Sequence, residues 1–142
     1  MLTIKKRLNE DETRIYISEI VLAIEHLHSL GIIYRDLKPD NIMIAEDGHL
    51  KITDFGLSKE NADSEFTSNS FVGTYAYAAP EVLKHKPHGK SLDWYLLGAL
   101  LYEFLVGVPP FYNTNQDIMN ENIINGALKL PRFISKEASD LI

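Results

Sequence analysis

Several polar side chains that could do chemistry together lie in one short stretch of the chain. Asp36, Lys38 and Asn41 fall within six residues of one another, and Pro39 between them prevents a helix from running through. The stretch is therefore predicted to be a loop that gathers three polar groups on one backbone. Thirteen residues after Asn41, a second carboxylate follows at Asp54, at the start of an Asp-Phe-Gly sequence.

These residue types fit one class of reaction. Asn41 and Asp54 offer oxygen ligands of the kind that Mg²⁺ accepts while keeping water and phosphate oxygens of its own. Asp36 is a carboxylate that can orient a hydroxyl group and accept its proton. Lys38 is a mobile positive charge that can neutralise a phosphoryl group during transfer. Together they indicate phosphoryl transfer to an alcohol, which depends mainly on positioning and charge neutralisation.

A long helix is predicted to lead into this loop. Asn9 followed by Glu12 has the pattern of a capping box, and Gly31 is a suitable residue for the end of the helix. Between them, apolar residues recur at helical spacing, namely Ile17, Ile20, Ile24 and Leu27. A helix of about 20 residues would be roughly 30 Å long.

A β-hairpin is predicted to follow the loop. Residues 42–44 and 50–52 are short apolar runs, and Glu-Asp-Gly at 46–48 is a turn signal between them. The hairpin would place Asn41 and Asp54 at its two open ends. Residues that are far apart in sequence would thereby meet in one site.

The second half of the chain is predicted to hold the core. Residues 58–70 are polar and lack a hydrophobic period, which is typical of an exposed loop. A second helix is predicted from Ser91, as its N-cap, to Val106, ending before Gly107. It is apolar nearly all round, Trp94 included, so we expect it at the centre of the core. Its one buried carboxylate, Asp93, must then accept hydrogen bonds.

Two further helices are predicted, one near residues 116–124 and one starting near Ser135.

The chain has 142 residues, a net charge of −6 and no cysteine. This composition argues against nucleic-acid binding and disulfides, and favours a cationic partner. No apolar run is long enough to span a bilayer and no secretory signal is expected. The histidines lack metal-ligand spacing.

The motifs together resemble the eukaryotic protein kinases. They occur in the order Tyr34-Arg35-Asp36-Leu37-Lys38-Pro39-Asp40-Asn41, Asp54-Phe55-Gly56, Gly73-Thr74 and Ala79-Pro80-Glu81, with Asp93-Trp94 in a buried helix. Tyr34 in place of the usual histidine, together with Leu101-Tyr102-Glu103 ahead of Pro109-Pro110-Phe111, resembles the AGC group. Within that group the chain is similar to protein kinase B and the serum- and glucocorticoid-regulated kinases.

The resemblance implies an α+β fold that is mainly α. We expect the C-terminal lobe of a protein kinase, a helical bundle around a buried central helix with a small β-hairpin at the active-site edge. The N-terminal β lobe, with its glycine-rich loop and strand lysine, is expected to be absent. Residues 1–142 would be a partial kinase domain, with the catalytic loop at 34–41 and the activation segment at 54–81.

The resemblance also implies roles for the polar residues. Asp36 would be the catalytic base, and Lys38 would contact the transferred phosphate of ATP. Asn41 and Asp54 would bind Mg²⁺ and, with Lys38 and Met43, the nucleotide. Thr74 would hydrogen-bond to Asp36 and Lys38, as expected of kinases that act on serine and threonine. Asp93 would anchor the loop by accepting from its backbone.

Regulation is implied by residues of the activation segment. Ser70 lies where the activating phosphate would be placed by an upstream kinase, although Thr67 and Ser68 are nearby competitors. Arg35 and Lys59 would receive that phosphate. Lys59 could equally be a plain surface lysine.

Substrate recognition is implied for a further set of residues. Asp40 and Glu103 match positions that read arginine upstream of the phosphoacceptor, which agrees with the acidic net charge; Glu103 could also be merely solvated. Phe71, Tyr75 and Ala78 would line the pocket for the residue just after the acceptor.

The leading hypothesis is therefore a serine/threonine protein kinase that uses ATP and Mg²⁺ on protein substrates with upstream basic residues. The alternative is a non-catalytic fragment that only binds proteins. A small-molecule phosphotransferase and a set of plain turn residues are weaker alternatives. The expected location is the cytoplasm, with the nucleus as a second compartment.

Overall fold

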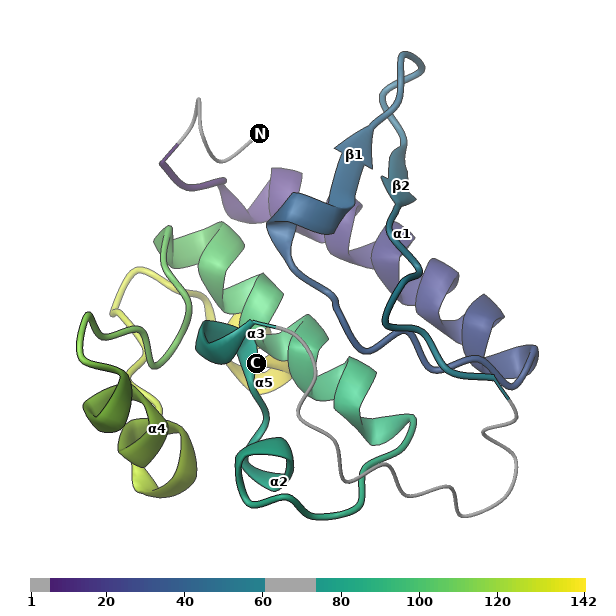
Figure 1. The fold of residues 1–142 in the computed structure, drawn as a ribbon. Helices are drawn as coiled ribbons and strands as arrows, with labels where there is room; N and C mark the ends of the chain where they lie inside the picture. The colour runs from purple at the N-terminus through teal and green to yellow at the C-terminus, as the bar shows by residue number, and fades with distance from the viewer. Residues whose placement is uncertain (1–5, 61–73) are drawn as a thin grey trace.

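The computed structural model of the chain describes residues 6–60 and 74–142. Along them the elements are α1 (Glu10–Ser29), β1 (Ile42–Ile44), β2 (Leu50–Ile52), α2 (Pro80–Leu83), α3 (Ser91–Val106), α4 (Gln116–Asn125) and α5 (Lys136–Leu141). Short 3₁₀ helices at Pro39–Asn41 and Tyr75–Tyr77 precede β1 and α2. The described residues are thus mostly helical with one small two-stranded sheet, as predicted (Figure 1).

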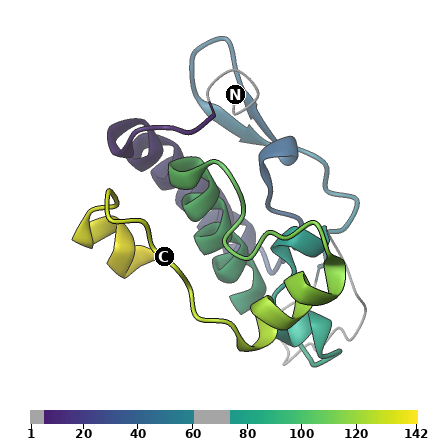
Figure 2. The same ribbon diagram turned by 90° about the vertical axis from the view of Figure 1, so that its left-hand side faces the viewer.

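Helix α1 forms as the sequence predicted. The Asn9 side chain accepts from the Glu12 amide at 2.8 Å, and the Glu12 carboxylate accepts from the Asn9 amide at 3.2 Å, which completes the capping box. Gly31, with a φ of 73°, turns the chain out of the helix. The buried face, which includes Ile20 and Ile24, packs along α3 (Figure 2).

Helix α3 is the central element of the core, and ten of its residues are buried. It ends where Gly107 adopts a left-handed conformation with a φ of 95°. Two details of the prediction are wrong. Ser91 is the first helical residue and the N-cap is Lys90, because the chain is already helical at that position. Trp94 is 40% exposed and lies edge-on to His28 instead of in the core.

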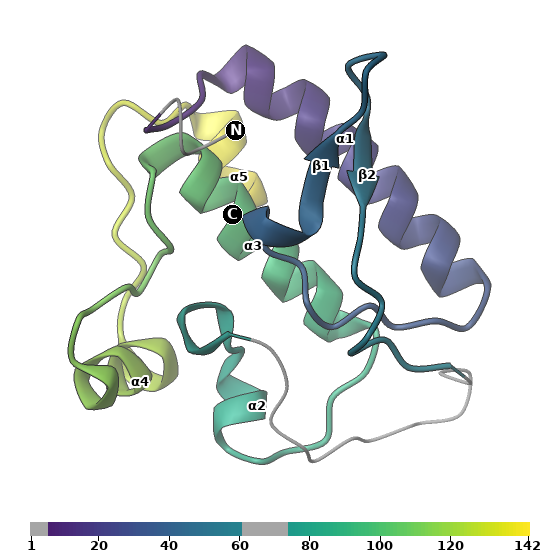
Figure 3. The same cartoon turned by 45° about the horizontal axis from the view of Figure 1, so that its top comes forward.

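The hairpin has the predicted strands in antiparallel register, with Ile42 opposite Ile52 and Ile44 opposite Leu50. It stands beside α1 (Figure 3), and its second strand contacts that helix. Because a two-stranded sheet is marginally stable alone, the hairpin depends on this support.

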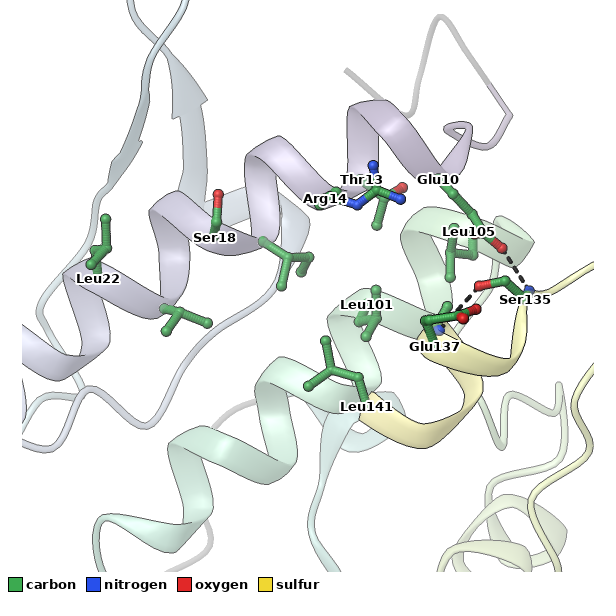
Figure 4. A pocket seen from close by; sticks show the side chains of 13 residues that line it. Glu10, Thr13, Arg14, Ser18, Leu22, Leu101, Leu105, Ser135, Glu137 and Leu141 are labelled. Carbon is green, nitrogen blue, oxygen red and sulfur yellow. Dashed lines mark hydrogen bonds between the residues drawn. The ribbon is translucent and has the colours of Figure 1, made fainter.

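Helix α5 is tied to the start of α1. The Ser135 side chain caps α5, and the Ser135 amide donates to the Glu10 carboxylate at 2.7 Å. Between α1, α3 and α5 lies an apolar groove, shown in Figure 4. None of the predicted site residues that the structure describes lines it. In the part of the chain that the structure describes, no helix is long and apolar enough to cross a membrane.

Helix α2 was not predicted. It is a single turn with Pro80 in its first positions, a placement that favours a helix start. No helix was expected at Ala79-Pro80-Glu81, so the proline signal was missed.

Candidate active site

The loop that carries the polar cluster is fixed from below by Asp93. This side chain is fully buried and accepts from the Tyr34 amide at 2.9 Å and from the Arg35 amide at 2.7 Å. His28 Nε2 lies 2.7 Å from the same carboxylate. The expectation that Asp93 accepts from the loop backbone is therefore met. The contact with His28 was not anticipated, since no sequence signal connects positions 65 residues apart.

Two residues of the site hold strained backbone conformations. Arg35 has a φ of 70° and Asp54 a φ of 57°, values that cost a residue with a side chain about 1–2 kcal/mol. Arg35 is held by its amide bond to Asp93 and by a 2.7 Å bond from its Nε to the Leu57 carbonyl. These bonds maintain the turn that aims the next residue, Asp36, into the site.

The predicted polar cluster is assembled around Asp36, which is 6% exposed. Lys38 Nζ lies 2.9 and 3.1 Å from the two carboxylate oxygens. Asn41 Nδ2 donates to Asp36 Oδ2 at 2.7 Å and to the Asp36 backbone carbonyl at 2.9 Å. Lys38 Nζ also reaches Thr74 Oγ1 at 3.4 Å. The carboxylate orientation is thus fixed from two sides.

The hairpin brings Asp54 next to the loop that carries this cluster. The amide of Thr53 donates to the Asn41 carbonyl at 2.9 Å, so the residue before Asp54 is joined to the loop. The Tyr34 hydroxyl donates to the Thr53 carbonyl, and its ring meets Phe55 edge-on with centroids 5.4 Å apart. Burial raises the pKa of the Tyr34 hydroxyl, so it stays a proton donor.

The oxygen atoms that could hold a metal ion are on Asn41 and Asp54. Asn41 uses its amide nitrogen on Asp36, which leaves its Oδ1 for a cation. Asp54 is exposed, and its Oδ1 accepts from the Gly56 amide at 3.1 Å. Among the described residues no cluster of three His, Cys, Asp or Glu side chains occurs. The donor set fits a Mg²⁺ ion whose other ligands are water and phosphate.

The structure describes both residues that are predicted to receive a phosphate, Arg35 and Lys59. The Arg35 guanidinium is half-buried, and burial lowers its pKa. Lys59 forms an isolated antiparallel bridge with Ile33, with backbone bonds of 2.8 and 2.9 Å. The bridge holds the chain that follows Asp54 against the chain that leads into the loop. Ser70 and Phe71 lie outside the described residues.

The residues predicted to read a substrate lie at the edge of the site. Asp40 is exposed, while Glu103 is half-buried and its Oε2 has no hydrogen-bond partner among the described residues. Burial, with a smaller contribution from the charge of Asp40, raises the pKa of Glu103 to about 7. A half-buried carboxylate whose pKa is raised in this way is a place where a cation would stabilise the charged form.

The remaining predicted site residues differ in exposure. Tyr75 is 43% exposed, whereas Ala78 is buried and lines a small recess together with Asp36 and Thr74. Met43 is 60% exposed on β1. Its side chain borders an open hollow with Lys51 and Thr53.

Comparison with known proteins gives a consistent result. The family model described as the protein kinase domain matches residues 1–142. The chain is similar to Protein kinase 2 of Dictyostelium discoideum, with 52% identity over 96% of the chain. It is 49% identical to Ribosomal protein S6 kinase beta of Caenorhabditis elegans and 47% identical to Ribosomal protein S6 kinase alpha-3 of Homo sapiens, each over 94% of the chain.

These relatives are much longer than the chain. It spans 28% of the Dictyostelium protein, 24% of the Caenorhabditis protein and 18% of the human protein.

Proposed function

The chain belongs to the protein kinase domain family, and on that premise we propose that it carries the catalytic loop of an AGC-type serine/threonine kinase. The reaction is transfer of the γ-phosphate of ATP to a serine or threonine of a protein substrate. The described residues are proposed to form the C-terminal lobe of the domain. The Asp36 carboxylate, held by Lys38 and Asn41 within 3.1 Å, is the observation that carries the proposal.

Each residue of the cluster has a part in the proposed reaction. Asp36 accepts a hydrogen bond from the acceptor hydroxyl, orients it and takes its proton as the new bond forms. The Asn41 amide keeps the carboxylate in one rotamer. Lys38, between Asp36 and Thr74, neutralises negative charge on the group being transferred. A substrate hydroxyl at Asp36 would also lie beside Thr74.

Mg²⁺ and ATP are proposed as cofactors, because kinase domains use both. Asn41 Oδ1 and Asp54 would hold the metal ion, whose charge offsets that of the phosphates. Met43, exposed at the hairpin, would lie under the adenine ring. Because Asn41 also bonds to Asp36, one residue connects the proposed metal site with the proposed base.

A protein substrate with upstream arginines is proposed from the acidic pair. A guanidinium between Asp40 and Glu103 would supply the partner that Glu103 Oε2 lacks within residues 6–60 and 74–142. Tyr75, Ala78 and Phe71 would form the pocket for the next substrate residue. Phosphorylation of Ser70 by an upstream kinase, with Arg35 and Lys59 as the phosphate ligands, completes the proposal.

The base assignment is tested by Asp36→Asn in the protein that contains residues 1–142. Asparagine keeps the size of the side chain but cannot take the proton, so phosphate transfer should fall roughly 10²- to 10⁴-fold. The measurement is transfer of radioactive phosphate to a peptide with arginines upstream of a serine.

Asp140→Asn, at an exposed position of α5, is the matched control and should leave the rate unchanged. Near-normal transfer by Asp36→Asn would refute the assignment. If the unsubstituted protein neither binds Mg²⁺-ATP nor transfers phosphate, the chain is a protein-binding module instead.

A further inference from the structure

The side chain of Glu19 on α1 contacts the hairpin directly. Its Oε2 accepts from the Leu50 amide at 2.7 Å, and its Oε1 lies 2.7 Å from His49 Nδ1. The Glu19 side chain is 25% exposed, whereas that of His49 is 71% exposed. One carboxylate on α1 therefore holds the residue that begins β2 and the residue just before it. We refer to Glu19, His49 and the Leu50 amide as the hairpin clasp.

The clasp provides a hydrogen-bond acceptor for the Leu50 amide, which the partner strand does not provide. In an antiparallel pair, alternate residues of a strand point their amides away from the partner strand. Leu50 lies opposite Ile44 in the register, but its amide is directed to α1, as the bond to Glu19 shows. An edge donor of this kind otherwise bonds to water or to another chain. A carboxylate acceptor makes a stronger bond than a neutral oxygen.

The clasp is connected to the candidate active site by the chain of β2 itself. Strand β2 ends at Ile52, and the next amide, that of Thr53, donates to the Asn41 carbonyl at 2.9 Å. Asp54 follows directly, with its strained φ of 57°. A displacement of β2 would therefore move Asp54 relative to Asn41, the two proposed metal ligands.

We propose that Glu19 is a positioning residue that fixes β2 against α1 and thereby sets Asp54 opposite Asn41. The significance for metal binding rests on the proposed function, whereas the mechanical coupling from Glu19 to Thr53 does not. Together with His28, which contacts Asp93 at 2.7 Å, Glu19 makes α1 the support of both halves of the site. One half is the loop, and the other is the hairpin.

The coupling is tested by hydrogen exchange measured by NMR on Glu19→Ala and on Glu25→Ala. Glu25 is an exposed glutamate of the same helix and serves as the matched control. Loss of the clasp should lower the protection of the Leu50 and Thr53 amides roughly tenfold, because each then opens by local motion of the hairpin. The Leu100 amide in α3 should keep its protection, and Glu25→Ala should match the unsubstituted protein.

A conservative variant separates the hydrogen bond from general stability. Glu19→Gln retains an oxygen that can accept from the Leu50 amide, so it should recover part of the protection at Leu50 and Thr53. The side-chain amide signals of Asn41 should shift in Glu19→Ala and return toward their original positions in Glu19→Gln. His49→Ala should have a smaller effect than Glu19→Ala, because the bond to Leu50 remains.

Three results would overturn the proposal. The first is unchanged protection at Thr53 in Glu19→Ala, and the second is an equal loss of protection throughout α1 and α3, which would indicate only global destabilisation. The third is no recovery at all in Glu19→Gln. Since none of these readouts needs phosphate transfer, failure of the proposed function would leave the test of the clasp intact.

Discussion

Helix α3 carries a carboxylate near each end, and the two have opposite environments. Asp93, in the first turn, is fully buried and receives hydrogen bonds from two loop amides and a contact from His28. Glu103, in the last turn, is half-buried, and in the part of the chain that the structure describes one of its oxygens has no partner. The helix dipole adds to the contrast, since it favours a negative charge at the N-terminal end and disfavours one at the C-terminal end.

On a single helix, one carboxylate stabilises the fold, and the other is suited to recognising a ligand. A buried charge with all its partners inside the chain holds one arrangement of the backbone, and here that arrangement is the turn at Arg35. A charge that lacks a partner is a cost that a ligand can remove. The partners of Asp93 thus lie within the fold, whereas Glu103 would obtain its partner from a cation that binds from outside.

Removing the charge of Asp93 should give the largest effect of this comparison. In Asp93→Asn one carboxylate oxygen is replaced by an NH2 group that cannot accept a hydrogen bond, so the amide of either Tyr34 or Arg35 is left unpaired. We expect the free energy of unfolding to fall by about 3 kcal/mol. Urea unfolding monitored through Trp94, which adjoins His28, measures the loss.

Asp140→Asn at the exposed end of α5 controls for removal of a carboxylate as such. It should change the unfolding free energy by less than about 0.5 kcal/mol. Equal stabilities of Asp93→Asn and Asp140→Asn would show that the buried contacts of Asp93 do not hold the loop.

Much of the fold that surrounds Asp93 was predictable because its signals are local. The capping box at Asn9 and the turn sequence between the two strands each lie within a few residues. Helix α3 was predicted from its apolar composition, but its N-cap was not, because the chain becomes helical one residue earlier than the nearest capping residue suggests. Trp94 was misplaced because an all-apolar helix gives no sign of which face meets solvent.

The features of the site likewise divide into those that the sequence could predict and those that it could not. Asp36, Lys38 and Asn41 are close in sequence and could be grouped from their spacing alone. The contacts of His28 with Asp93 and of Glu19 with His49 join positions that are 65 and 30 residues apart. No local pattern encodes such pairs. The positive φ values of Arg35 and Asp54 were also not predicted, because arginine gives no sign of one and aspartate adopts one only occasionally.

The difference between Asp93 and Glu103 can be tested further by measuring the affinity for a cationic peptide at different pH values. Below its raised pKa of about 7, Glu103 is largely protonated in the free protein and must lose that proton to pair with an arginine. If pairing lowers the pKa well below 6, the affinity should rise about tenfold from pH 6 to pH 8. Calorimetry at constant ionic strength, with a histidine-free peptide that has arginines upstream of a serine, measures the change.

Glu103→Gln is the control for that titration, because it cannot ionise. Its affinity should be lower than that of the unsubstituted protein at pH 8 and nearly independent of pH. A pH dependence that persists in Glu103→Gln would assign the effect to another group.

The smallest effect is expected on the stability of the protein without ligand. The folded-state pKa of Glu103 is raised above its ordinary value of 4.5, so the folded state binds the proton more tightly than the unfolded state does. Stability is therefore lost as pH rises from about 4.5 through about 7. Glu103→Gln avoids this loss and should be more stable than the unsubstituted protein by about 1 kcal/mol at pH 8, a value already reduced for solvent screening.

At pH 4 the two proteins should have nearly equal stability, because Glu103 is then neutral in both the folded and the unfolded state. Urea unfolding at pH 4, 6 and 8 gives the profile. The opposite order at pH 8, with Glu103→Gln the less stable protein, would mean that the Glu103 carboxylate is already stabilised within the chain. The two ends of α3 would then be alike, and the case for a cation at Glu103 would be lost.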